Sequence, residues 1–336
     1  MKPRVPALLL VLSLAVAACG DGEGTSTGSP SPASSGTGAV ELAVIPQASY
    51  DLATGTDQRV IFGALLSDRT LIGGGTLDVV VVSLPSADAT TGTVVSQTTA
   101  DFLVVPGMEA PESADQPAPI DGARVSGVYQ LRTDLSSAGF YGLQVSGTLA
   151  DGQAVAGNAI FSVAAEHRIV AAGDPAPRTD NPTANDDVPL VSLDSCAQEG
   201  NPCDPGNPDA PIALRHPFLY EVTIADAIAA GRPVVVVVST PVFCVSRFCG
   251  PVTDSIAALA SEYGDRADFV HLEVWENFQE QTINAAAAEW IQLPDGSAME
   301  PWTFLIDETG TIAARWDNVL DLADLTSRLE ALPPLD

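Results

Sequence analysis

The most regular apolar pattern in the chain begins at Pro233. Five consecutive valines, residues 234–238, follow this proline and end before the pair Thr240-Pro241. The run is too short and too β-branched for a helix, and polar residues do not alternate within it. It therefore predicts a strand that is buried on both faces, as the central strands of parallel sheets are.

A helical pattern follows this strand after Gly250-Pro251. Apolar residues recur at the spacing of one helix face, at Val252, Ile256, Leu259 and Tyr263. Cys244 and Cys249 lie between the predicted strand and this helix. The unpaired N–H groups and the dipole at the start of a helix stabilise a thiolate, so the two cysteines are candidate redox residues.

Short apolar runs without helical periodicity fill residues 40–165. Seven such runs are separated by Gly, Asp, Ser and Pro, which predicts a two-sheet sandwich of immunoglobulin type. Two of them, around Tyr129 and Tyr141, are joined by Ser-Ser-Ala-Gly at 136–139 and are expected to form a hairpin. The segment contains no cysteine or histidine, so we expect it to serve as a docking or spacer domain.

A bridge rich in Pro, Asp, Asn and Gly, residues 166–217, is expected to lack regular structure. It contains Cys196 and Cys203, separated by six residues that include a Gly-Asn-Pro turn. A local structural disulfide between them is favoured over a metal site, because a metal site needs further Cys or His at ligand spacing.

The first 18 residues have the form of an export signal, with a basic start, an apolar core and the sequence Val-Ala-Ala-Cys ending at Cys19. This ending resembles the lipobox of bacterial lipoproteins, which implies cleavage before Cys19 and attachment of lipid to its sulfur. An ordinary secretory signal is the alternative. Residues 19–39 are rich in Gly, Ser, Thr and Pro and are expected to form a flexible tether. These features predict an extracytoplasmic protein that is lipid-anchored to the bacterial cell membrane.

The net charge of the chain limits the classes of molecule that it can bind. It has 14 Lys and Arg against 43 Asp and Glu, a formal net charge of −29, and its one lysine, Lys2, lies in the signal. Such an acidic chain is not a nucleic-acid-binding protein. Without lysine, the mature chain can form neither a Walker phosphate loop nor a Schiff base, and no motif indicates a cofactor.

The second predicted domain covers residues 218–333. Around the valine strand the pattern predicts a short helix over 223–230, a strand over 268–274, a helix with Ile283, Ala287 and Trp290 on one face, a hairpin over 301–316 and a last helix from Leu322. With the cysteines before a helix and the segment Glu-Pro-Trp-Thr-Phe-Leu-Ile-Asp at 300–307, this order resembles the thioredoxin-like superfamily. The resemblance implies an α/β thioredoxin-like fold in which Pro301 is cis and faces the redox cysteines.

The sequence departs from that family in two respects. Four residues separate Cys244 from Cys249 where the family has two, so a disulfide requires either that Cys244 lies outside the helix or that the first helical turn unwinds. Val237 and Val238 stand where thioredoxins have a buried acid. The spacing is also similar to that of some peroxiredoxins, but Thr240 is displaced relative to Cys244 and Pro301 aligns with their catalytic arginine, which disfavours peroxidase activity.

Two functions stay open from the sequence. The first is a membrane-anchored thiol–disulfide oxidoreductase in which Cys244 attacks, Cys249 resolves and Pro301 presents backbone groups to a protein thiol or disulfide substrate. The second is a non-enzymatic lipoprotein whose C-terminal domain is a binding module, with Cys244 and Cys249 as a structural clip. His271, in a predicted strand, is expected to be a packed histidine rather than a base.

Overall fold

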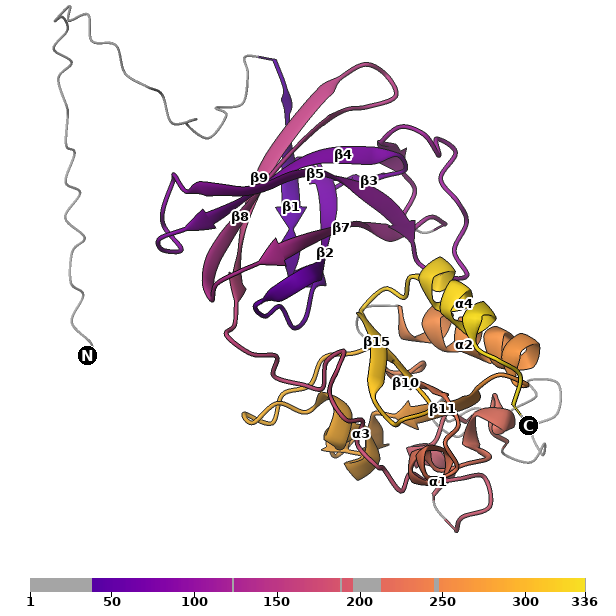
Figure 1. Cartoon of the computed structure of the whole chain (residues 1–336). Coiled ribbons are helices and arrows are strands. Elements are labelled where there is room, and N and C mark those ends of the chain that lie inside the picture. Colours follow the sequence, from indigo (N-terminus) through magenta and orange to yellow (C-terminus); the bar gives the residue numbers. More distant parts are fainter. Residues whose placement is uncertain (1–37, 123, 188, 196–212, 245–247, 336) are drawn as a thin grey trace, which may run out of the picture.

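The computed structural model describes residues 38–335 except 123, 188, 196–212 and 245–247. The described chain forms two units that lie against each other, a β-barrel and a smaller unit built on a four-stranded sheet (Figure 1). The barrel unit contains β1 (Val40–Ile45), β2 (Gly55–Leu66), β3 (Leu71–Gly73), β4 (Thr76–Leu84), β5 (Thr93–Val104), β6 (Ala118–Ile120), β7 (Gly127–Leu135), β8 (Gly139–Thr148) and β9 (Ala154–Val163).

Seven of these strands close on themselves. Their order is β1-β9-β8-β4-β5-β7-β2, and β2 pairs in turn with β1. Strand β1 closes the barrel because it pairs with two partners. Val40 and Glu41 lie parallel to β9, and the stretch from Leu42 to Ile45 lies antiparallel to β2. The short strands β3 and β6 extend the sheet at β2.

The barrel interior is an apolar core that follows from the alternation of its strands. Inward residues such as Phe62, Tyr129, Tyr141 and Leu143 are fully or almost fully buried and belong to one cluster. The Tyr129 hydroxyl donates a hydrogen bond of 2.9 Å to the carbonyl oxygen of Gly74, so this polar group is satisfied inside the core. Alternation therefore correctly identified the inward residues.

The expected immunoglobulin-like sandwich is nevertheless wrong. The strands form one continuous sheet that buries its inner face against itself, whereas a sandwich packs two separate sheets. The expected hairpin is also wrong, because β7 and β8 are not paired with each other. Strand β7 lies between β5 and β2, and β8 lies between β4 and β9. Alternation shows which residues face a core, but it does not show which strand lies beside which.

The second unit is built on a sheet with the order β11-β10-β14-β15. Its strands are β10 (Val234–Ser239), β11 (Asp268–Glu273), β14 (Trp302–Ile306) and β15 (Ile312–Asp317), and a separate pair is formed by β12 (Trp275–Asn277) and β13 (Thr282–Ile283). The valine strand β10 is central and wholly buried, as predicted. It runs parallel to β11 and antiparallel to β14.

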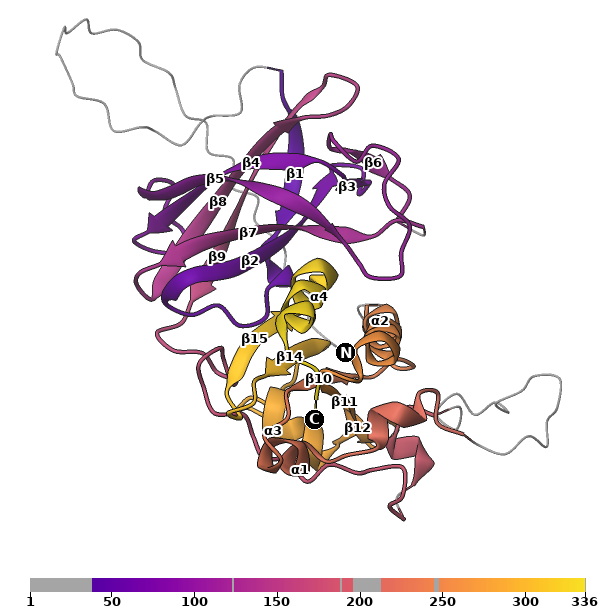
Figure 2. The same cartoon turned by 45° about the vertical axis from the view of Figure 1, so that its right-hand side comes forward.

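Helices cover both faces of this sheet (Figure 2). They are α1 (Ile224–Ala229), α2 (Cys249–Tyr263), α3 (Ala285–Ile291) and α4 (Leu322–Ala331). Val234, Val236 and Val238 pack on the side of α1 and α3, and Val235 and Val237 pack on the side of α2 and α4. The absence of polar alternation in β10 therefore reflects burial between two helical layers.

The side chains of Thr223, Asn284 and Asp321 cap α1, α3 and α4 by accepting hydrogen bonds from the first turn of each helix. The cap at Thr223 and the positions of most of these elements agree with the sequence patterns, but Ile283, expected on the face of the third helix, lies in β13 before α3 begins at Ala285.

The assigned fold class, a sandwich joined to a thioredoxin-like α/β domain, does not stand. The protein is predominantly β and is dominated by the closed barrel, and the α-helices in the described residues are four segments of 6, 15, 7 and 10 residues. Periodicity correctly located individual strands and helices after residue 222. It did not justify assigning a superfamily, because a local order of strands and helices is compatible with several architectures.

The described part of the bridge is mostly irregular, but it contains the short 3-10 helix η2 (Leu190–Ser192), which was not expected, and it is packed on the sheet unit. The hydroxyl of Thr179 accepts a hydrogen bond from the indole N–H of Trp290 and donates one to Glu289, at 2.9 and 2.6 Å. The side-chain oxygen of Asn181 accepts one from the backbone N–H of Ile224 at 2.8 Å. The bridge thus forms part of the second unit.

Buried charges join the two units. Arg59 on β2 and Asp317 on β15 form an ion pair of 2.7 Å, and both side chains are about nine-tenths buried. The same guanidinium donates to the carbonyl oxygens of Asp317 and Val319. Asp51, which is 6% exposed, contacts Arg315, Arg168 and the ring of His167 at 3.1 to 3.3 Å. We refer to the contacts around Asp51 and Asp317 as the charged junction.

An apolar contact adjoins the charged junction. Val319 of the sheet unit packs into a cluster of barrel residues that includes Ile61 and Val105, and Phe248 packs against the same cluster. Because Phe248 directly precedes Cys249, the barrel contacts the chain immediately before α2.

Candidate functional site

Cys244 and Cys249 form a disulfide, with an S–S distance of 2.13 Å and Cα atoms 5.9 Å apart. Cys244 lies in a turn after β10, and Cys249 is the first residue of α2. The pair can bond despite its wide spacing because Cys244 lies outside the helix, which is one of the two arrangements that the geometric argument from the sequence allowed.

The two sulfurs lie in different environments. Cys244 is partly exposed, whereas Cys249 is fully buried. The backbone N–H of Cys249, at the start of the 15-residue helix α2, donates to Sγ of Cys244 at 3.4 Å. An N–H donor and a helix N-terminus both favour negative charge on this sulfur once the bond is opened.

A chain of buried hydrogen bonds extends behind Cys249. The Thr253 hydroxyl donates to the Cys249 carbonyl at 2.8 Å and lies 2.6 Å from the Ser239 hydroxyl. Nε2 of His271 lies 2.9 Å from that hydroxyl, and Nδ1 lies 2.6 Å from the hydroxyl of Tyr220. Burial lowers the pKa of His271 to about 3, so its ring is neutral. The expectation of a packed histidine is confirmed by its 1% exposure.

Two buried carboxyl groups lie at the same end of β10. Glu300 precedes β14, and Glu273, which is 1% exposed, ends β11. Burial and the charge of Glu273 raise the pKa of Glu300 to about 8, although its carboxyl accepts a hydrogen bond from the backbone of Thr240. At neutral pH the Glu300 carboxyl is therefore mostly protonated. We refer to this end of the strand, with Glu273, Glu300 and the disulfide beyond Thr240, as the β10 edge.

Sequence reasoning missed this pair of acids. It examined only the residues just before Cys244, where Val237 and Val238 stand, whereas the acids come from the neighbouring strands. A signal was present in the sequence, because Glu273 interrupts a buried strand and Glu300 directly precedes a proline expected to be cis.

The Glu300–Pro301 peptide bond is cis. Pro301 is buried, and its carbonyl accepts a hydrogen bond of 2.8 Å from the backbone N–H of Asn318. The carbonyl of Glu300 accepts one of 2.9 Å from the hydroxyl of Tyr50, which belongs to the barrel unit. An extended substrate at Pro301 would have to compete with Tyr50 for this carbonyl.

Aromatic side chains flank the partly exposed sulfur. Phe243, the residue before Cys244, is stacked on Phe278 with ring centroids 4.0 Å apart and planes within 2° of parallel. Trp275 meets Phe278 edge-on at 5.4 Å. Since Phe278 is 38% exposed, this cluster offers an apolar surface beside Cys244.

Several predicted positions lie outside the described residues. These are Cys19, the proposed lipidation site, and Cys196 and Cys203, the expected structural disulfide. Over the described ranges, no group of three or more His, Cys, Asp or Glu side chains is arranged to hold a metal ion. Among the helices described, none combines the length and apolar character needed to cross a membrane.

No protein-family model matches the chain, and no curated protein matches it significantly. The resemblance to the thioredoxin-like superfamily therefore has no support from a family match, and the barrel-dominated fold contradicts it. Function is inferred from the site alone.

Proposed function

We propose that this protein is an extracytoplasmic thiol–disulfide oxidoreductase in which Cys244 is the attacking thiol and Cys249 the resolving thiol. The observation that carries the proposal is the asymmetry of the disulfide. Cys244 is partly exposed and receives the first N–H of α2, whereas Cys249 is fully buried at the start of the same helix. Reactive cysteines occupy such partly exposed, electropositive positions.

The exchange moves two electrons and two protons. In the oxidised protein, a thiolate of a substrate dithiol attacks Sγ of Cys244, which breaks the Cys244–Cys249 bond, forms a mixed disulfide and releases the Cys249 sulfur. The second substrate thiolate then attacks the substrate sulfur in this mixed disulfide and releases Cys244 as a thiolate. The substrate leaves as a disulfide, and the protein retains two reduced cysteines. The reverse sequence reduces a substrate disulfide.

The surroundings of the disulfide favour this chemistry. Because Glu300 is mostly protonated, the β10 edge carries less negative charge than it would with two ionised carboxylates. An approaching or departing thiolate is therefore repelled less strongly. The aromatic cluster of Phe243, Trp275 and Phe278 provides an apolar contact beside Cys244, which suits a protein substrate better than a small hydrophilic thiol.

Trapping tests the proposal. In the Cys249→Ser variant the resolving thiol is missing, so mixed disulfides on Cys244 should accumulate in extracts of the exported fraction. Cys244→Ser is the matched control and should trap nothing. Alkylation of Cys244 against pH should give a thiol pKa below the free value of about 8.5. The proposal fails if no adduct forms on Cys244 and its thiol titrates like a free cysteine.

A structural clip is the second candidate, and the complete burial of Cys249 is the observation that favours it. The reduction potential separates the two functions. A structural disulfide of an exported protein has a potential below about −300 mV, and a working redox pair lies well above this value. Equilibration of the purified protein with defined thiol buffers, followed by alkylation, measures the potential directly.

Membrane attachment through lipid on Cys19 is part of the proposal. The Val-Ala-Ala-Cys ending of the signal supports it. Cys19→Ser should release the protein from membranes or halt its processing, while the wild type should carry acyl mass on its first peptide. Recovery of the wild type entirely in the soluble exported fraction, without acyl mass, would refute attachment.

A further inference from the structure

The barrel is not closed by strand pairing along all of β9. On one side β9 pairs with β8 over its whole length. On the other side it pairs with β1 only at Val155 and Ala156, and the next contact is the bridge between Ala53 and Ala164. Between these points, β1 turns away to pair with β2. We call the open stretch of β9, from residue 158 to 163, the seam.

Backbone groups in the seam lack a strand partner. Ala164 exchanges hydrogen bonds with Leu52 and Thr54 on the seam side, at 2.9 and 3.0 Å. Because successive residues of a strand direct their N–H and C=O groups to opposite sides, those of Ile160 and Ser162 face the same side as those of Ala164. Two residues with donors and acceptors at strand spacing thus lie on an edge that no described strand covers.

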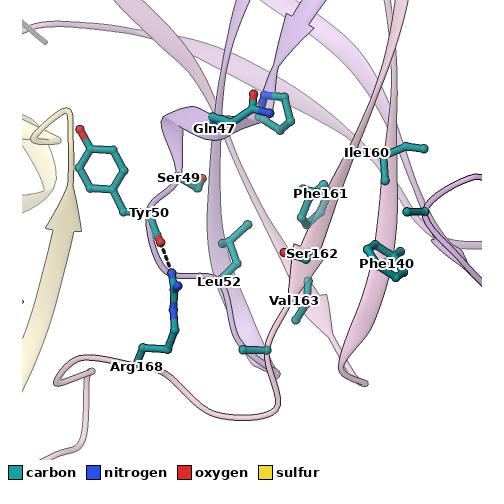
Figure 3. A pocket seen from close by; sticks show the side chains of 13 residues that line it. Gln47, Ser49, Tyr50, Leu52, Phe140, Ile160, Phe161, Ser162, Val163 and Arg168 are labelled. Atoms are coloured by element: carbon teal, nitrogen blue, oxygen red, sulfur yellow. Dashed lines mark hydrogen bonds between the residues drawn. The ribbon is translucent and has the colours of Figure 1, made fainter. Parts of the chain in front are cut away.

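A cavity of about 630 Å³ lies at the seam (Figure 3). One wall carries Ile160 and Phe161 of β9 and Phe140 of β8, and the opposite wall is the segment with Gln47, Ser49 and Leu52. Phe140 and Ile160 are 38% and 41% exposed, so they present apolar side chains to solvent at the mouth of the cavity. The volume is typical of a ligand site.

The charge of the cavity is unusual for this chain. Although the chain has 43 acidic residues, the lining contains no carboxylate and one formal charge, the guanidinium of Arg168. Arg168 donates to the Tyr50 carbonyl at 2.7 Å and contacts Asp51 at 3.3 Å, and half of its side chain is exposed. Arg315 contacts the same Asp51 carboxylate, and Asp295 also interacts electrostatically with Arg168, so Arg168 is the cationic group that the cavity itself presents.

We propose that the seam binds the C-terminal segment of a partner polypeptide by strand addition. The segment is extended, carries apolar side chains that contact Phe140 and Ile160, and pairs with the backbone of Ile160 and Ser162. It runs parallel to β9, as β1 does, so that its terminal carboxylate reaches Arg168. The unpaired strand edge favours a polypeptide over a small apolar ligand, since an acyl chain does not satisfy backbone groups. The proposal does not depend on the redox function.

The probe is a peptide selected from a library of random heptapeptides. The peptides are displayed with free C-termini and are selected for binding to the full-length protein. An enriched peptide is then synthesised with an N-terminal fluorescein and titrated by fluorescence polarisation. Arg168→Gln and amidation of the peptide C-terminus should each weaken binding about tenfold or more, because each removes a charge-assisted contact. Ile160→Glu should weaken it similarly. Val94→Glu is the matched control, since Val94 is equally exposed at 40% on β5 and does not line the cavity.

Amide hydrogen exchange gives a second measurement. Bound peptide should slow exchange at Ile160 and Ser162 and leave Phe161 and Val163, whose N–H groups face β8, unchanged. The proposal is overturned if selection yields no peptide that depends on Ile160 and Arg168, or if the amidated peptide binds equally well. Displacement of the peptide by a fluorescent fatty acid with no protection of the two amides would assign the cavity to an acyl chain. Dimerisation that Ile160→Glu abolishes, with no peptide recovered, would assign the seam to a second copy of this chain.

Discussion

Two regions of this molecule hold buried carboxyl groups in opposite surroundings. At the charged junction, Asp51 contacts Arg315, Arg168 and His167, and their hydrogen bonds and charges lower its pKa despite burial. At the β10 edge, burial and Glu273 raise the pKa of Glu300 to about 8, and no arginine in the described part of the chain is paired with Glu300. One region keeps its buried acid ionised, and the other keeps it neutral.

The difference shows how a chain with few cations distributes them. The chain has 14 basic residues against 43 acidic ones, yet several buried acids in the described residues have an arginine partner. Asp51 and Asp317 are paired at the charged junction, so ion pairs join the units, and Asp194 and Asp268 are paired with arginines within the sheet unit. Among the described residues, no arginine is paired with Glu300, whose carboxyl is mostly protonated at neutral pH. Ion pairs thus join the two units in the first region, and for the second region we propose a role in the chemistry of the disulfide.

Removing Arg59 should have the largest effect on stability. Arg59→Ala leaves Asp317 buried without its partner and frees two carbonyls, which should lower the free energy of unfolding by about 3 to 5 kcal/mol in urea denaturation. Arg124→Ala is the matched control, because its pair with Glu109 is exposed, and it should leave stability nearly unchanged. Equal effects of the two substitutions would contradict the assembly role of the charged junction.

Neutralising Glu300 should stabilise the protein at alkaline pH. Its folded pKa of about 8 lies above the ordinary 4.5, so the unfolded chain releases this proton first and stability falls as pH rises from 4.5 through 8. Glu300→Gln should remove this fall and raise the free energy of unfolding at pH 8 by on the order of 3 kcal/mol. Denaturation of the wild type and of Glu300→Gln at pH 5 and pH 8 measures both the fall in stability and its removal.

At the charged junction we expect the opposite dependence of stability on pH. The folded pKa of Asp51 is lowered, so its ionised form contributes stability above its ordinary pKa of 3.8, and this contribution is lost as pH falls toward the folded pKa. Asp51→Asn should therefore destabilise the protein at neutral pH, where Glu300→Gln stabilises it. The same sign for both substitutions would remove the contrast between the two regions.

Opening the disulfide should have a moderate effect. The pair closes a short loop, with a sequence separation of 5, and loop entropy predicts a loss of about 2 kcal/mol in the double Cys244→Ser, Cys249→Ser variant. Thermal unfolding is measured for the wild type with and without reductant and for the double variant. The variant is then compared with the reduced wild type. A loss much larger than this would indicate that the bond is a structural clip.

The smallest effect is expected for Tyr50→Phe, which removes the hydrogen bond between the barrel and the Glu300 carbonyl. Stability should fall by about 1 kcal/mol. The free carbonyl beside the cis bond should then be available to a substrate, so the disulfide should react faster with a peptide dithiol. An unchanged exchange rate would mean that Tyr50 does not restrict access to the site.

Much of the candidate site could be predicted from local sequence. The valine run predicted β10, the helical spacing located α2, and the argument from disulfide reach required either Cys244 outside the helix or an unwound first turn. Each inference depends on residues close together in the chain, where period and covalent geometry are sufficient. The cis bond before Pro301 was likewise expected, through a family resemblance that the whole fold does not support.

What the sequence did not show depends on distant pairing. The separation of β7 from β8 arises because β4 and β5 lie between them in the barrel. The ion pair of Arg59 with Asp317 joins residues 258 positions apart, and Glu300 comes close enough to Glu273 to raise its pKa only because β11 ends and β14 begins at the same edge of β10. Neither periodicity nor spacing contains this information.

The double pairing of β1 has a mechanical consequence. The predicted membrane tether enters the fold at β1, so tension between the cell surface and the sheet unit would act first on this strand. Leu42 to Ile45 are bonded alongside β2, and Val40 and Glu41 alongside β9, so a pull along the strand would load several ladder bonds at once rather than peel them one by one. At the far end of β1 the chain continues to Tyr50, whose backbone N–H donates to Asp317 of the sheet unit at 2.6 Å. Force would thus pass from the anchor to the sheet unit through the barrel wall.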